Sequence, residues 1–317
     1  MDKKDYSLLA DKVIGMLMHN GADMETNNHL AMDNWEWPTG VALYSLFKVY
    51  EKSGDKSYLD MLTEWFDHQF SKPAPHRNVN TVAPVLAMVS IYSVTKDEKY
   101  LPHINSWADW VMNEMPRTQY DGLQHMTVLN HHHEQLWDDT LFMAVLFLVK
   151  AGKLFDRKDW IEEAKYQFLI HIKYLQDKIT GLFYHGWTFD LRHNFANAFW
   201  ARGNSWFTAA SVEFIEILDD KDDAVSKYVH AAWLDQVKEL QKYQGINGLF
   251  NTLLDDEGSY YETSATAAIA YGVHKGLRVG LLEGKKYEDM SNNAIAAVVR
   301  KIDEDGTVEG VSFGTGM

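Results

Sequence analysis

The chain has 317 residues, of which 46% are hydrophobic and 13% aromatic, so it is far too apolar for a disordered protein. Its net charge of −15, without a dense Lys/Arg cluster, makes nucleic acid and anionic membranes poor partners. The absence of cysteine excludes disulfides, thiolate catalysis and Cys-ligated metals.

The predicted elements are almost all helices. Apolar residues recur at helical spacing in eleven segments, and the stretches between them carry Gly, Asn, Asp and Pro. No long alternation of β-branched residues argues for a large sheet, so we expect an all-α chain. The expected helices, in chain order, are 5–19, 38–52, 57–70, 81–95, 98–113, 136–151, 158–176, 204–218, 224–243, 261–278 and 285–300.

The N-terminal segment, MDKKDYSLLADKVIGMLMHNG, has charged and apolar residues at helical spacing and lacks the apolar core of a signal peptide. The longest apolar run, residues 141–149, is too short to span a bilayer. We therefore expect a cytoplasmic protein.

Four loops share a glycine ahead of a short extended segment. They are YDGLQHM at 120, ITGLFYHGW at 179, INGLFNTLL at 246 and EDGTVEGVS at 304, at intervals of 59, 67 and 58 residues. Two helices and two loops occupy about that length, so the period indicates stacked helical hairpins. Six hairpins closing on themselves form an (α/α)6 toroid, expected here as a single catalytic domain over residues 1–317. Eleven helices are one short of twelve, so the final helix is expected to be missing or irregular.

Loops ahead of the inner helices of such a ring meet at one mouth, and four stretches there are rich in polar and aromatic residues. They are MDNWEWPTG, HRNVNTVAP, NHHHEQLWDDT, and YHGWTFD with FWARGNSW. Asp138 and Asp139 fall in the predicted first turn of a helix, where carboxylates serve as caps. Adjacent helical residues point about 100° apart, so one can cap while the other faces the cavity. Capping suits Asp138 better, and Asp139 needs burial against Trp137 to become a proton donor.

The three consecutive histidines with Glu134 suggest a metal site, but adjacent side chains rarely reach one ion. We expect no metal and no cofactor, and we place His133 at the rim of a substrate site.

FWARGNSW sets Arg202 between Trp200 and Trp206. A guanidinium suits a carboxylate and Trp faces suit sugar rings, although a Trp pair in the core with a structural Arg is the plainer alternative. His185 and Trp37 extend the same saccharide-like lining.

With these residues the sequence resembles glycoside hydrolase family 105, the unsaturated rhamnogalacturonyl hydrolases, and more distantly the unsaturated glucuronyl hydrolases of family 88. The matching pieces are QLWDDTLFM, FYHGW, FWARGNSW and YYETSATAAIAYGVHKGLR, in the same order and spread over most of the chain. The resemblance implies an (α/α)6 barrel. It also implies an enzyme that removes a 4,5-unsaturated uronic acid from the non-reducing end of lyase-generated, pectin-derived oligosaccharides.

Family members protonate C4 of the vinyl ether and add water at C5. The family pattern gives the acid role to Asp139, matches His185 to a cavity histidine, and places Trp200, Arg202 and Trp206 around the unsaturated sugar. We expect Trp137 among the substrate-binding residues as well. Where these families often have a second aspartate, this sequence has Asn78 and Asn80, whose amides can bind a hydroxyl or a water but cannot ionise. Family members also continue past the stretch matching VSFGTG with another helix.

Two other functions remain open from the sequence. An inverting glycosidase would pair Asp139 with Asp190 or Glu134 across an intact glycosidic bond. A carbohydrate-binding protein on a degenerate toroid would explain the asparagine pair and the short C-terminus.

Overall fold

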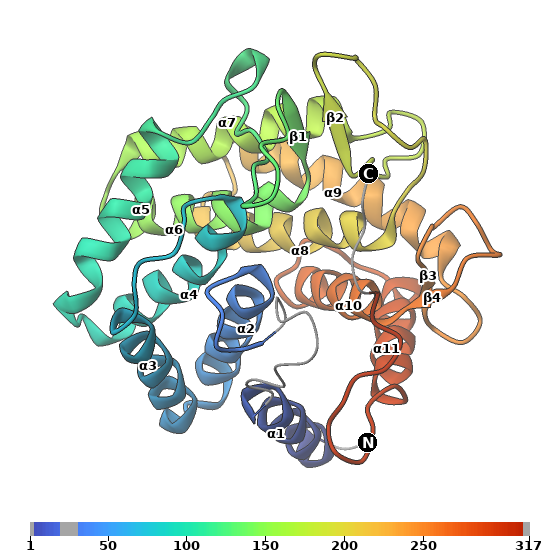
Figure 1. Cartoon of the computed structure of the whole chain (residues 1–317). Helices are drawn as coiled ribbons and strands as arrows, with labels where there is room; N and C mark the ends of the chain where they lie inside the picture. The colour runs from blue at the N-terminus through green and yellow to red at the C-terminus, as the bar shows by residue number, and fades with distance from the viewer. Residues whose placement is uncertain (1–2, 20–30, 313–317) are drawn as a thin grey trace. The chain divides into compact units, whose positions relative to one another are not determined.

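A computed structural model describes residues 3–19 and 31–312 of the chain. These residues hold eleven α-helices and four short strands (Figure 1), so the predicted all-α class is confirmed. None of the described helices is both long enough and apolar enough to cross a membrane. The chain divides into two compact units, and the single domain expected over residues 1–317 stays a prediction.

The first unit contains most of the N-terminal half together with residues 125–132 and 143–164. Its central helix is α4 (Val79–Thr95), which is buried along nearly its whole length because its sequence is almost entirely apolar. Asn78 caps this helix, and Gly40 of α2 lets the two helices touch, since a Cβ there would lie 2.6 Å from the backbone of Ala83. The other helices are α1 (Lys3–His19), α2 (Trp37–Ser53), α3 (Lys56–Phe70), α5 (Leu101–Asn113) and α6 (Leu146–Leu154).

The second unit contains residues 117–124, 133–142 and those from 165 onward. Its central helix is α8 (Ala201–Leu218), which packs against both α9 (Ala224–Tyr243) and α10 (Thr263–Arg278). Helix α10 packs in turn against α11 (Lys285–Val299). Helix α7 (Lys158–Leu175) begins in the first unit and ends in the second.

The glycine loops of the predicted repeat form one recurring structure in the second unit. Each is closed by an antiparallel bridge across its turn, and three of the turn glycines adopt positive φ, with values of 82° at Gly181, 90° at Gly248 and 96° at Gly306. A side chain would be strained there, which explains the glycines. The bridges are Arg117 with Leu123, Gln176 with Phe183, Gln244 with Phe250, and Ile302 with Val308.

All eleven predicted helices are present, and the clearest error concerns the helix expected over 136–151. The chain instead forms strand β1 (Gln135–Trp137), which pairs with β2 (Gly186–Thr188), and then a π-helical turn at Leu141–Val145 before α6. The sequence did not predict this strand, because the periodicity of apolar residues does not distinguish a short buried strand from a helix. Strands β3 (Phe250–Asn251) and β4 (Tyr261–Glu262) form a second small ladder.

Candidate active site

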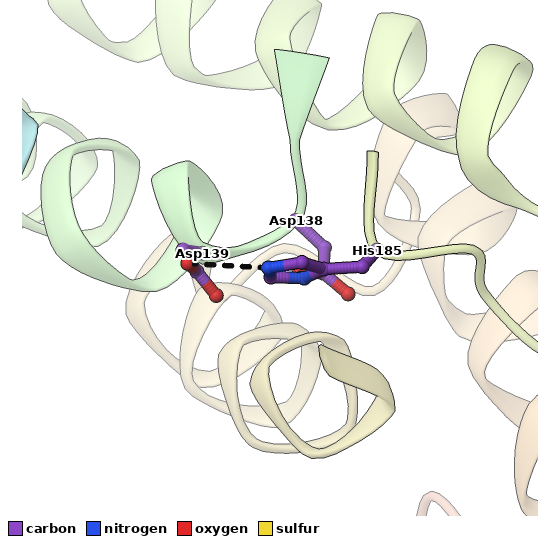
Figure 2. Close-up of side chains that lie close together, drawn as sticks. All are labelled: Asp138, Asp139 and His185. Atoms are coloured by element: carbon purple, nitrogen blue, oxygen red, sulfur yellow. Dashed lines mark hydrogen bonds and ion pairs between the residues drawn. The ribbon is translucent and has the colours of Figure 1, made fainter. Parts of the chain in front are cut away.

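Two carboxyl groups and an imidazole meet in the second unit (Figure 2). Asp138 and Asp139 directly follow β1 and His185 directly precedes β2, so the pairing of the two strands brings them together. The N–H of Asp138 donates to the carbonyl of His185 at 3.0 Å. Oδ1 of Asp138 lies 2.7 Å from Nδ1 of the imidazole, and Oδ2 of Asp139 lies 3.8 Å from Nε2.

The three groups differ in their access to solvent. The side chain of Asp138 is fully buried and that of His185 nearly so, whereas Asp139 keeps 19% of its side chain exposed. Burial raises the pKa of Asp138 well above its usual range and lowers that of the imidazole. Burial, aided by the neighbouring Asp138, raises the pKa of Asp139 to about 7. This carboxyl can therefore hold a proton near neutral pH and still reach a ligand.

One oxygen on each carboxyl group has no hydrogen-bond partner among the residues that the structure describes. They are Oδ2 of Asp138 and Oδ1 of Asp139, and both atoms are buried. Buried polar atoms are nearly always satisfied, because an unmade hydrogen bond costs about 1–3 kcal/mol. An unfavourable arrangement of this kind is typical of a functional site.

The first turn of α8 holds this group in place. A Cβ on Gly203 would lie 2.9 Å from Oδ2 of Asp138 and 3.1 Å from Nδ1 of His185, so only glycine lets the helix come this close. The side-chain amide of Asn204 accepts from the N–H of Phe183 and donates to its carbonyl, both at 2.8 Å. The helix thereby fixes the backbone that leads to the imidazole.

Aromatic rings surround the imidazole. The ring of His185 lies 4.5 Å from Trp200 and 5.0 Å from Trp137, and Trp206 lies 5.4 Å from Phe142. All four aromatic residues are buried, at 7% or 8% exposure. A wall of this kind lowers the local dielectric, which explains the strong effect of burial on the carboxyl groups.

Arg202 supplies a positive charge to the site. Its guanidinium lies 4.8 Å from the centre of the Trp200 ring, and its charge opposes part of the rise in the pKa of Asp139. Nη1 donates to the carbonyl of Ser312 at 2.8 Å, and the N–H of Ser312 donates to Oε1 of Glu262 at 2.8 Å. The C-terminal end of the described chain therefore anchors this guanidinium.

Residues 9–317 match the sequence model of Glycosyl Hydrolase Family 88. The chain belongs to this family. It is 31% identical over 285 residues to the unsaturated rhamnogalacturonyl hydrolase YesR of Bacillus subtilis, which covers 89% of the chain and 80% of that protein.

Two solved structures resemble this family 88 chain over its whole length. One, from Salmonella enterica, is described as a possible member of family 105; it is 41% identical, with a TM-score of 0.96, and the match covers 86% of its chain. The other, from Klebsiella pneumoniae, carries the same description and is 40% identical, with a TM-score of 0.96 and 86% coverage. The chain is a glycoside hydrolase with the fold of this helical toroid family, which confirms the predicted resemblance, fold class and enzyme class.

Five of the predicted site residues lie together in this family 88 chain, and five others need separate description. His133 is 77% exposed, and its Nδ1 lies 3.0 Å from Oδ2 of Asp190. Asn78 accepts from the N–H of Asn80 at 2.9 Å as the cap of α4, and Trp37 begins α2. These two asparagines and Trp37 belong to the first unit, so their contact with substrate stays a prediction. The remaining residue, Trp206, packs on Phe142, and its contact with substrate stays a prediction. The five residues that lie together are Trp137, Asp139, His185, Trp200 and Arg202.

The sequence missed the bond between Asp138 and His185. The residues are 47 positions apart, and a helix cap was the simplest use for a carboxylate at that position. The sequence analysis gave no role to Gly203 or Asn204 of FWARGNSW. A glycine inside a helical pattern can indicate a close approach to another group, and this signal could have identified Gly203.

A metal ion could be considered at the same three residues. Asp138, Asp139 and His185 each offer one atom within 4.8 Å of the others, which is true of no other such group in the described part of the chain. The hydrogen bond between Asp138 and the imidazole already accounts for one atom of each, and the prediction of no metal stays a prediction.

Proposed function

We propose that the chain removes a 4,5-unsaturated uronic acid from the non-reducing end of an oligosaccharide, with Asp139 as the acid that protonates the vinyl ether. The observation that carries this proposal is a partly accessible carboxyl group whose pKa burial raises to about 7. The name of the relative YesR, an unsaturated rhamnogalacturonyl hydrolase, supports a pectin-derived substrate.

The reaction needs a single group that first gives and then takes a proton. Asp139 transfers its proton to C4 of the sugar, and the positive charge that develops is shared by C5 and the ring oxygen. Water adds at C5 and gives its proton to the carboxylate, which restores the acid. The hemiketal at C5 then opens, and the glycosidic bond breaks without displacement at the anomeric carbon.

The neighbouring groups suit an anionic sugar. Arg202, held by the carbonyl of Ser312, supplies positive charge near Asp139 for the uronate carboxylate. Trp200, Trp206 and Trp137 provide apolar faces that suit the sugar ring and exclude water. We assign these residues to substrate binding together with His185.

An inverting glycosidase is the second candidate, and it requires two carboxyl groups about 6.5–9.5 Å apart. The partners considered for Asp139 are engaged elsewhere. Asp190 is paired with His133, and Oε2 of Glu134 accepts from the N–H of Gln119 at 2.6 Å. These contacts favour hydration, because each of the two carboxyl groups is bonded to a group other than Asp139 or His185.

The direct test is turnover of an unsaturated disaccharide, followed by the ultraviolet absorbance of the conjugated double bond. The wild type is expected to remove the double bond, and Asp139→Asn to lose about 10²–10⁴-fold in kcat while it still binds the sugar. Asp235→Asn, at an exposed position, is the matched control and should keep wild-type activity. Binding without turnover by the wild type would instead identify a carbohydrate-binding protein.

A further inference from the structure

Asp138 is a buried titratable group that the proposed reaction does not use. Its side chain is fully buried, with one oxygen on the imidazole and the other without a partner. The imidazole connects it to Asp139, since Nδ1 faces Asp138 at 2.7 Å and Nε2 faces Asp139 at 3.8 Å. Figure 2 shows the three side chains in this order, with the ring of His185 between the carboxyl groups.

We propose that Asp138 and His185 form a proton relay that loads Asp139 with its acid proton when an anionic sugar covers the site. This inference rests on the proposed function, because it explains how the same carboxyl stays an acid above neutral pH. Asp138 acts through the imidazole and is therefore a positioning residue for the proton.

The relay works because two arrangements contain the same number of protons. In the first, the protonated carboxyl group of Asp138 donates a hydrogen bond to Nδ1, while Nε2 carries a hydrogen and faces the carboxylate of Asp139 across 3.8 Å. In the second, the proton on Nε2 has moved to Oδ2 of Asp139 and the proton on Asp138 has moved to Nδ1. The total charge of the three groups is −1 in both, and only its location changes.

Burial decides which arrangement is favoured. In the free protein the negative charge is more stable on Asp139, which is 19% exposed, than on the fully buried Asp138. A bound uronate removes water from Asp139 and brings its own negative charge close, so the charge is driven inward to Asp138. The gap of 3.8 Å must shorten for this transfer, as hydrogen bonds at catalytic sites do on substrate binding.

Among the described residues, Arg202 is a charged group outside the relay that acts on it. The pKa of Asp138 responds to burial and to hydrogen bonds with Asp139. The pKa of Asp139 responds to burial, His185, Asp138 and Arg202, and that of His185 responds to burial, Asp139 and Arg202. The pH dependence of turnover therefore reports on the three relay groups.

The experiment compares kcat/KM, which reports the protonation of the free protein, between about pH 6 and about pH 9 for the wild type and Asp138→Asn, with the unsaturated disaccharide as substrate. The wild type should stay level above neutral pH, because the acid proton is supplied from Asp138. Asparagine cannot store that proton, so kcat/KM of the variant should fall about tenfold for each pH unit above the pKa of Asp139, which is about 7 in the free protein. Asp235→Asn should keep the wild-type profile.

The outcomes separate the two proposals. If the wild type turns over the sugar but itself loses activity about tenfold per pH unit above about 7, the relay is wrong and the hydration reaction stands; this holds even if Asp138→Asn does not fold. A variant that is slower by the same factor at every pH would show a merely structural Asp138 and also overturn the relay. A wild type that is inactive at every pH would overturn the proposed function and the relay with it.

Discussion

The carboxyl group of Asp139 is held where ionisation is unfavourable, and it differs in this from an ordinary surface aspartate. Its pKa lies near 7 because the aromatic rings and the first turn of α8 keep water away. The same burial that suits proton transfer should lower the free energy of unfolding at a pH where Asp139 is ionised, because the buried charge is unfavourable. Stability and activity often compete at such sites.

Asp139→Asn should therefore stabilise the protein at alkaline pH. The pKa is about 7 in the folded state against 3.8 for the ordinary group, so the folded state binds more protons between these values. The free energy of unfolding consequently falls as pH rises from about 4 to about 7, and stays low above it. We expect the variant to be more stable than the wild type by about 1–3 kcal/mol at pH ~8 and equal to it near pH ~4, measured by urea unfolding. Equal stability at both pH values would contradict the assigned pKa.

Gly203→Ala tests the close approach of α8 to the relay. The new methyl group would meet Oδ2 of Asp138 at 2.9 Å and push the carboxyl group or the imidazole out of line. We expect kcat to fall at least about tenfold, although alanine favours helix by about 1 kcal/mol over glycine. Gly15→Ala in α1 is the matched control, because no described residue lies within 4 Å of its Cβ position and activity should not change. Full activity of Gly203→Ala would show that α8 can accommodate a methyl group beside Asp138 and His185, and would contradict the close approach.

At the scale of elements, periodic apolar patterning located all eleven helices, while the contacts that build the site escaped it. The stretch WDDTLFM reads as the start of a helix, yet the chain makes a strand before the aspartates because residues 186–188 are there to pair with it. Likewise, nothing local tells that Asn204 binds the backbone of Phe183. Side-chain chemistry could be read from the sequence, but the pairing between distant segments could not.

Helices α8 and α10 are joined by a buried ion pair that gives a prediction of its own. Lys275 is 2% exposed and contacts both Glu213, which is 1% exposed, and Glu216 at 2.6 Å. Lys275→Met removes the cation from beside the buried carboxylate of Glu213, which keeps its hydrogen bond from Tyr271, so we expect a loss of about 3–5 kcal/mol in the free energy of unfolding. The double variant Glu213→Leu, Lys275→Met should recover much of this loss. A Lys275→Met protein as stable as the wild type would show that the pair contributes nothing.

At the scale of the whole molecule, the net charge of −15 opposes the approach of an anionic sugar. A local cation such as Arg202 favours the binding of this sugar. Charges more than about 8–10 Å away are screened at ordinary ionic strength. We therefore expect kcat/KM for the unsaturated uronide to rise when the salt concentration increases at fixed pH, by a few-fold at most. A steady fall with salt would mean that attraction by local cations dominates the encounter.

The central claim is that Asp139 protonates a carbon–carbon double bond and that the glycosidic bond breaks only afterwards. The most direct measurement uses an unsaturated uronate whose anomeric carbon is joined to its substituent through carbon, so that no glycosidic bond can be hydrolysed. The wild type should still consume the double bond, seen as loss of ultraviolet absorbance, and Asp139→Asn should not. An intact double bond after prolonged incubation with a wild-type protein that cleaves the ordinary disaccharide would contradict the account.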